Sequence, residues 1–267
     1  MLSGFIITYV HFDDIGITER LQHYAWRRFT RVYPNYWSVT LIYVGLALVS
    51  PDSAERLSLL NVLESLTLLP LGHMPLIPVA WTLEREVIFY LVFGLVIWSR
   101  KLAWPLIAVG LAPMASGLFR APGFGLADLV LSPFNVQFLM GIGAARLVVN
   151  GAVPCPIIIA GFGVTVFVVT AILDVNGVVA VNQLMTAMLY GSGSALMVGG
   201  IAATERAGLL RLGSWAELVG GASYALYLFI RRLSASSRGS WPWLTYSDRF
   251  PPGLSSPYRR VCPWQSP

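Results

Sequence analysis

Three charged side chains, Glu84, Arg85 and Glu86, stand together near the start of an apolar run that continues to Trp98. Charged groups inside a membrane-spanning segment usually face the interior of a helix bundle or a wet cavity, and they mark a functional path. Glu86 and Tyr90 are four residues apart, so they share one face of a helix. We expect Glu86 to be the deepest acid and to line a cavity near the outer face. The alternative is that Arg85, or the outer interface, merely relieves its charge.

Three residues that precede this cluster in the sequence are candidates to line the outer part of the same cavity. Trp81 and Thr82 lie one helical turn before Glu86, and His73 precedes them in the stretch PLGHMPLIP. A His73–Glu86 pair is conceivable on the outer side, and a solvated loop histidine is the alternative.

Two arginines form a second candidate site. Arg28 and Arg31 are three residues apart in YAWRRFTRVYPNYW and therefore share a helical face at the rim of the next apolar run. Paired guanidiniums are well shaped to hold a phosphate or a carboxylate. The alternative is an anchor that touches lipid headgroups. We expect Pro34 to end this helix just before the next span begins.

The elements that must position these residues are membrane helices. Of 267 residues, 56% are hydrophobic and only 12% are charged, with a mean hydropathy of +0.67. Soluble domains carry roughly 25% charged residues. The apolar runs show no period-2 alternation, so the sequence predicts an all-α polytopic bundle rather than a barrel. We expect about seven complete spans and a partial N-terminal span, with the complete ones at 35–50, 79–98, 102–119, 133–149, 156–173, 178–203 and 214–230.

The basic residues predict an orientation. If each span crosses once, most arginines fall on one side of the membrane, and that side is cytoplasmic by the positive-inside rule. The lipid bilayer or an anionic ligand then accounts for the net charge of +5, and no nucleic acid is needed. We find no motif for a metal, a phosphate-binding glycine loop or a nucleophile elbow, and we expect no disulfide between Cys155 and Cys262.

Two kinds of segment should shape the bundle. Small residues at helical spacing in 138–145 and 191–200 suit close helix contact in lipid, although such residues are common in membrane helices in any case. The stretch between Arg56 and Pro70 is too short to span and is predicted to be an amphipathic or re-entrant helix on the outer side.

The two ends of the chain differ from its middle. The first ten residues, MLSGFIITYV, are apolar but too short to cross a bilayer, so they resemble the last half of a span. After residue 230 the composition changes to a tail rich in Ser, Pro and Arg. We therefore divide the chain into a helical bundle, 1–230, and a tail, 231–267, which is either disordered or read in a shifted frame.

Five strings, in order, resemble the membrane acyltransferase family 3, and its exopolysaccharide acyltransferase branch in particular. They are SGFIITY, RRFTRVYPNYW, WTLEREVIFY, FLMGIGAARL and GGASYALYLFI. Each string alone is weakly specific, but together they cover nearly the whole predicted membrane part.

The resemblance implies a bundle of about ten helices in the bacterial inner membrane. It implies transfer of an acyl group, commonly acetyl, from cytoplasmic acyl-coenzyme A to a carbohydrate hydroxyl of an exopolysaccharide or envelope glycan. Acyl-coenzyme A is a substrate here, and no bound cofactor is expected. Arg28 and Arg31 match the family's R-x-x-R pair, which binds the donor, and Glu86 matches the acid of its W-[ST]-L-x-x-E motif. Trp81, Thr82, Tyr90 and His73 are assigned to the acceptor side.

The sequence also departs from the family pattern. The family's histidine, a general base, lies in a span upstream of SGFIITY, and an acyl transfer without a positioned base forfeits about 10²- to 10⁴-fold in rate. The last motif runs into Arg231 and Arg232 where a histidine is usual. The chain is thus expected to be truncated at both ends, and its activity as a fragment stays open. A small-molecule transporter or exporter and a non-catalytic remnant are the alternatives.

Overall fold

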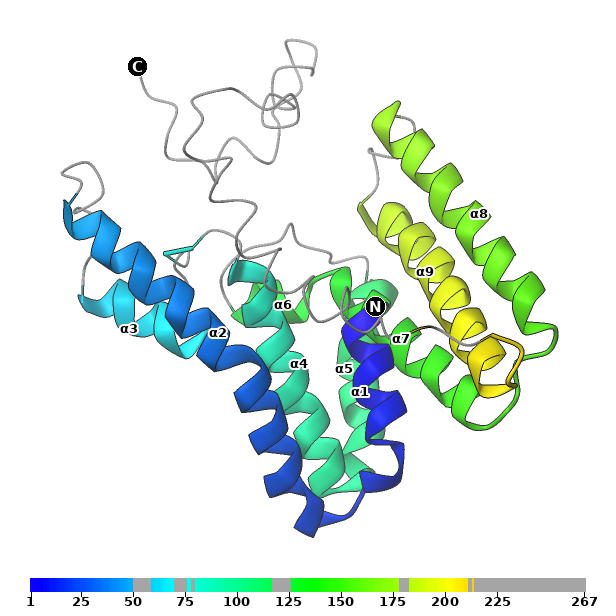
Figure 1. Cartoon of the computed structure of the whole chain (residues 1–267), viewed down its shortest axis with the longest axis horizontal. Helices are drawn as coiled ribbons and strands as arrows, with labels where there is room; N and C mark the ends of the chain where they lie inside the picture. The colour runs from blue at the N-terminus through cyan, green and yellow to red at the C-terminus, as the bar shows by residue number, and fades with distance from the viewer. Residues whose placement is uncertain are drawn as a thin grey trace. The chain divides into compact units, whose positions relative to one another are not determined.

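The described part of the chain is built entirely of helices, which confirms the predicted all-α class (Figure 1). The structure, a computed structural model, describes residues 1–49, 59–69, 76–77, 80–116, 126–177, 183–210 and 213. The chain divides into two compact units, Met1–Glu217 and Leu218–Pro267, and every described residue belongs to the first. The predicted span 214–230, the predicted division after residue 230 and the tail lie outside the described residues.

The helix boundaries follow the apolar runs closely. The predicted spans at 79–98, 102–119, 133–149, 156–173 and 178–203 overlap α4, α5, α7, α8 and α9, and the described residues of the predicted span at 35–50 form the second half of α2. In chain order the α-helices are α1 (Leu2–Val10), α2 (Leu21–Val49), α3 (Leu59–Thr67), α4 (Trp81–Trp98), α5 (Ala103–Ser116), α6 (Leu126–Val130), α7 (Phe134–Val149), α8 (Pro156–Val175) and α9 (Gln183–Arg206). Short 3₁₀ turns are η1 (Phe12–Asp14), η2 (Thr18–Arg20) and η5 (Arg100–Leu102).

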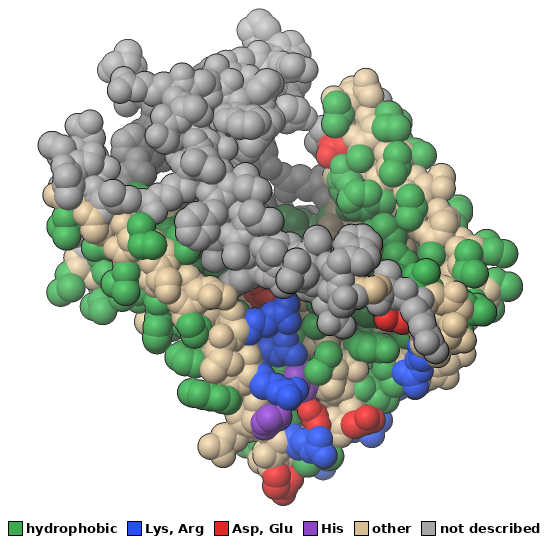
Figure 2. All heavy atoms as spheres, viewed as in Figure 1, with side chains coloured by type: hydrophobic (Ala, Val, Ile, Leu, Met, Phe, Trp, Pro, Cys, Tyr) green, Lys and Arg blue, Asp and Glu red, His purple; other side chains and the backbone are tan. Residues whose placement is uncertain are grey.

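Two of the described helices are long and apolar enough to cross a membrane, Pro156–Val175 and Leu184–Arg206. Helix α8 leaves large apolar side chains uncovered, with Ile158 70% and Phe162 60% exposed. Figure 2 shows hydrophobic side chains over the surface of α8 and α9. Such surfaces are stable in contact with lipid and costly in water. The count of seven spans stays a prediction.

Helix α2 corrects the prediction at Pro34. The helix does not end there but continues from Leu21 to Val49, and Figure 1 shows it bending part-way along. Proline removes one hydrogen bond of the helix ladder, which kinks a helix more often than it ends one in a membrane bundle, because neighbouring polar groups compensate. Nearby hydroxyls bond to other carbonyls of the helix: Ser38 Oγ donates to the carbonyl of Pro34 over 2.8 Å, and Thr30 Oγ1 donates to that of Trp26 over 3.0 Å.

The middle of α2 is hydrogen-bonded to the C-terminal end of the short helix α3. The hydroxyl of Tyr33 donates to the carbonyl of Thr67 over 2.9 Å, and Trp37 Nε1 donates to that of Leu66 over 3.0 Å. The last carbonyls of a helix lack partners within the helix, so these bonds complete its C-terminus. The predicted helix between Arg56 and Pro70 is confirmed in Leu59–Thr67, and its depth in the membrane stays a prediction.

Glycines allow the backbones of the remaining helices to pack closely against one another. Helix α1 packs on α7, and α8 packs on α9. A Cβ atom on Gly141 of α7 would overlap the backbone of α1 at Met1, and one on Gly4 would overlap the carbonyl of Phe138. On α9, a Cβ on Gly193 would come within 2.9 Å of the backbone nitrogen of Phe167 in α8. The prediction that small residues allow close helix contact is confirmed.

Candidate active site

Glu86 is held by two helices. The hydroxyl of Tyr90, one turn further along α4, donates a hydrogen bond to Glu86 Oε1. The hydroxyl of Ser3 in α1 donates to the same oxygen over 3.3 Å. The predicted sharing of one face by Glu86 and Tyr90 is confirmed, and the half-buried carboxylate has a fixed orientation.

Arg28 lies inside the interface between α2 and α4, with only 8% of its surface exposed. Its guanidinium carbon is 5.7 Å from the centre of the Tyr24 ring and 5.3 Å from the centre of the Tyr90 ring. Cations within about 6 Å of an aromatic centre are attracted by the ring. Among the described residues, Arg28 Nε has no hydrogen-bond partner. This enclosure disfavours the alternative that Arg28 is a headgroup anchor.

Tyr90 joins the two predicted sites. Its ring faces Arg28 and its hydroxyl binds Glu86. The hydroxyl of Tyr24 donates to the backbone carbonyl of Tyr90 over 2.9 Å, which fixes α2 against α4 at this level. From the sequence, the arginine pair and the acid were expected near opposite rims. In the structure a single side chain, that of Tyr90, lies between Arg28 and Glu86 and contacts both.

Arg31 differs from Arg28 in its surroundings. Its side chain is exposed, whereas that of Arg28 is buried. The two arginines that were predicted to act as a pair therefore differ: the guanidinium of Arg28 is buried and that of Arg31 is exposed.

A cavity of about 460 Å³ opens between α2 and α4; Arg28 and Tyr90 line it, whereas Arg31 and Glu86 do not. Arg28 is the charged member of an otherwise apolar and aromatic wall. The wall consists of Leu21, Tyr24, Ala25, Arg28, Phe29, Val32, Tyr33, Val87, Tyr90, Leu91, Gly94, Leu95 and Trp98. This volume falls within the range of about 300–1,000 Å³ that is usual for small-molecule sites.

The structure describes only some of the residues that were predicted to lie on the acceptor side. Thr82 lies half-buried in the first turn of α4, one turn before Glu86. Trp81 is the first residue of that helix. The side chain of Trp81 and the whole of His73 lie outside the described residues.

The sequence matches the family described as "Acyltransferase domain" over residues 1–233. It is also 30% identical, over 249 residues, to the "Exopolysaccharide production protein ExoZ" of Rhizobium meliloti (strain 1021). That similarity covers 86% of this chain and 72% of the relative. The chain belongs to membrane acyltransferase family 3. No solved structure matches it.

Membership of acyltransferase family 3 makes the chain a membrane-associated acyltransferase. Arg28, Arg31 and Glu86 were assigned from the sequence, and the structure adds the tyrosine that contacts both Arg28 and Glu86. That connection was not predicted, because it depends on how α2 packs against α4.

Sequence analysis did not single out the neighbours of Glu86 as buried. Glu84 is 5% exposed and Arg85 is 7% exposed. An Arg85 terminal nitrogen donates to Ser132 Oγ over 2.8 Å, and its guanidinium lies 5.4 Å from the Phe134 ring. Arg85 thus contacts Ser132 and Phe134, which lie in the segment that leads into α7.

A histidine–aspartate pair was also missed. His11 is 2% exposed, its Nδ1 lies 2.7 Å from Asp14 Oδ2, and Arg20 donates to Asp14 Oδ1 over 2.9 Å. The His11 ring contacts the Tyr24 ring edge-on at 4.9 Å. Burial lowers the pKa of His11, which favours the neutral ring. The signal in the sequence was the i, i+3 spacing of His11 and Asp14 directly after an apolar helix.

Proposed function

We propose that this acyltransferase moves an acetyl group from acetyl-coenzyme A to a carbohydrate hydroxyl of an exopolysaccharide or envelope glycan in the bacterial inner membrane. The Arg-rich side is cytoplasmic in this proposal. The observation that supports it best is the continuous contact from Arg28 through Tyr90 to Glu86. The name of the R. meliloti relative supports the class of acceptor.

The donor enters from the arginine side. Coenzyme A carries several phosphates, and the exposed Arg31 suits such a group. The pantetheine arm lies in the cavity between α2 and α4, whose wall is apolar apart from Arg28. The free Nε of Arg28 donates to a carbonyl oxygen of the donor. The thioester is thereby brought next to Tyr90.

The acceptor meets the donor at Glu86. A sugar hydroxyl is a weak nucleophile near neutral pH, so a positioned proton acceptor accelerates its attack. The hydroxyl oxygen bonds to the thioester carbon, the carbon–sulfur bond breaks, and the hydroxyl proton passes to Glu86. The coenzyme A thiolate then takes up that proton, which leaves an ester, a free thiol and the ionised carboxylate. Tyr90 and Ser3 hold Glu86 in place during the transfer.

The test is transfer of radiolabelled acetyl from acetyl-coenzyme A to alkali-labile esters of polysaccharide in isolated membranes. We expect labelling with the unmodified chain and a fall of about 10²-fold or more for Glu86→Gln, because general acid–base catalysis contributes about 10²- to 10⁴-fold. Arg28→Lys and Arg31→Ala should raise the KM for acetyl-coenzyme A. Arg27→Ala removes the same charge from an exposed neighbouring position and should change neither parameter.

Three results would contradict parts of the proposal. Equal labelling by all variants would remove the assigned roles. An unmodified chain that is present in the membrane but transfers no label would favour a non-catalytic remnant. Efflux of a small solute without ester formation would favour a transporter.

A further inference from the structure

A second cavity, of about 300 Å³, lies among α1, α4, α5 and α7. This volume lies at the lower end of the range of about 300–1,000 Å³ that is usual for small-molecule sites. Its wall is aromatic and aliphatic, including Phe89, Phe93, Leu106, Phe138, Leu139 and Ile142. The occupant must therefore be largely apolar.

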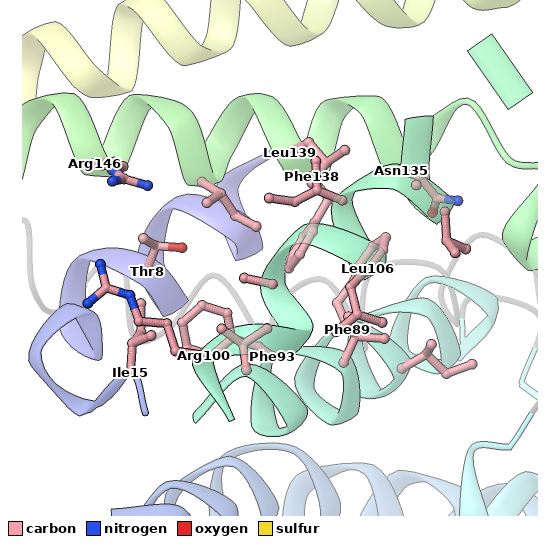
Figure 3. A pocket seen from close by; sticks show the side chains of 18 of the residues that line it. Thr8, Ile15, Phe89, Phe93, Arg100, Leu106, Asn135, Phe138, Leu139 and Arg146 are labelled. Carbon is pink, nitrogen blue, oxygen red and sulfur yellow. The ribbon is translucent and has the colours of Figure 1, made fainter. Parts of the chain in front are cut away.

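One end of this cavity is polar. Figure 3 shows Arg100, Arg146 and Thr8 together at one end and Asn135 at the other. Both arginines are exposed, and neither forms an ion pair with another described residue. They lie on the side that the charge bias predicts to be cytoplasmic. The cavity is thus apolar along its length and cationic at one mouth.

Thr8 gives an independent indication of a ligand. It is 2% exposed, yet its hydroxyl has no hydrogen-bond partner among the described residues. Helical threonines usually bond a carbonyl one turn earlier, as Thr170 does to Val166 over 2.7 Å and Thr204 to Gly200 over 2.7 Å. The Thr8 hydroxyl makes no such bond, and Figure 3 shows its oxygen turned toward the cavity. A buried hydroxyl without a partner is destabilising unless a ligand binds it.

We propose that this cavity binds one acyl chain of an anionic phospholipid from the cytoplasmic leaflet. Arg100 and Arg146 hold the phosphate, and Thr8 donates to an ester oxygen of the lipid. Guanidinium groups form charge-assisted hydrogen bonds to phosphate, and anionic lipids concentrate in that leaflet. The lipid site is separate from the Arg28 cavity, so lipid binding does not depend on the proposed transferase reaction.

The test uses a phosphatidylglycerol that carries a diazirine midway along one acyl chain. The full chain, purified in detergent, is irradiated with this probe, and the labelled peptides are mapped by mass spectrometry. We expect labels on the peptides that carry Phe89, Leu106 and Leu139. The double variant Arg100→Gln/Arg146→Gln should reduce labelling by about tenfold or more, since hydrogen bonds to charged groups are among the stronger ones.

Matched control variants distinguish labelling at this cavity from nonspecific binding of lipid to the protein surface. Lys101→Gln removes a charge next to Arg100 from a side chain that does not line the cavity, and it should label normally. Thr8→Val keeps the shape without the hydroxyl and should reduce labelling a few-fold, and Ala103→Phe should fill the space and exclude the chain. Size-exclusion profiles verify that each variant is folded.

Several outcomes would overturn the proposal. One is equal labelling by a matching phosphatidylcholine probe, and another is labelling that the double arginine variant leaves unchanged. Competition by palmitoyl-coenzyme A at concentrations where lysophosphatidylglycerol has no effect would identify a long-chain acyl donor instead. Full competition by inorganic phosphate would indicate a simple anion site. Because the readout is labelling, loss of transferase activity alone does not affect the conclusion.

Discussion

The hydroxyl of Tyr24 donates a 2.9 Å hydrogen bond to the backbone carbonyl of Tyr90, so the helix that carries Arg28 is fixed to the helix that carries Glu86. The same two tyrosine rings enclose the Arg28 guanidinium. The distance between Arg28 and Glu86 therefore depends on this local contact between α2 and α4.

The Tyr90 hydroxyl should matter for rate more than for folding. Tyr90→Phe keeps the ring beside Arg28 and removes the bond to Glu86. We expect kcat for acetyl transfer to fall roughly 10- to 100-fold, because a hydrogen bond to a charged group is lost. The KM for acetyl-coenzyme A should change little. An equal loss on Tyr43→Phe, in the second half of α2, would argue against a specific role.

The Tyr24 hydroxyl should instead matter for stability. Tyr24→Phe leaves the aromatic contacts of His11 and Arg28 and removes only the bond to α4. We expect a loss of about 1 kcal/mol in the free energy of unfolding, the usual contribution of one hydrogen bond. Thermal unfolding in detergent measures this change, and a normal Tm would contradict it.

Acid should weaken the turn between α1 and α2. The pKa of His11 is lowered chiefly by burial, from an ordinary value of 6.5, so the unfolded chain binds a proton there more readily than the folded chain does. Burial alone would raise the pKa of Asp14, but the bonds to His11 and Arg20 outweigh it and the pKa is lowered. Both shifts make stability fall as the pH drops, first below 6.5 for His11 and then through the acidic range for Asp14.

The measurement is Tm as a function of pH between 5 and 8, in detergent. His11→Gln should flatten the decline below pH 6.5. His23→Gln, at an exposed position, should leave the decline in place. A profile that is flat for the unmodified protein would show that His11 is accessible to protons in the folded state.

The contact between α1 and α7 should not tolerate a side chain at Gly141. A Cβ there would overlap the backbone of Met1 and approach the nitrogen of Phe5 at 2.8 Å. We expect Gly141→Ala to lower the free energy of unfolding by about 1–3 kcal/mol, as overpacking does. Gly143→Ala, two residues along the same helix, meets nothing within 4 Å and should be neutral or stabilising, because alanine favours helix. Tm values of the two variants provide the comparison.

The helices and one pair within the site were predictable because they depend on spacing along one segment. Apolar runs located α4, α7, α8 and α9, and the i, i+4 spacing placed Tyr90 beside Glu86. Arg28 was chosen from its type and motif, but its burial depends on contacts between α2 and α4 that no local pattern reveals.

Two errors have physical explanations. The rule that proline ends a helix comes from water, where a broken ladder is easily solvated. In a membrane bundle a continued helix keeps more backbone hydrogen bonds than a helix that ends at the proline, and α2 accordingly continues through Pro34. The His11–Asp14 pair was missed, because Asp14 and Tyr24 enclose the His11 ring only in the folded chain. Enclosure of a loop by a later helix is a tertiary effect.

The position of Arg28 beside the Tyr90 ring has a consequence for the order of events. A donor that attracts the guanidinium also alters the field around the phenol, and the phenol is what grips the carboxylate. If the donor binds at Arg28 as proposed, its arrival therefore affects the carboxylate through one aromatic ring and requires no movement of a helix.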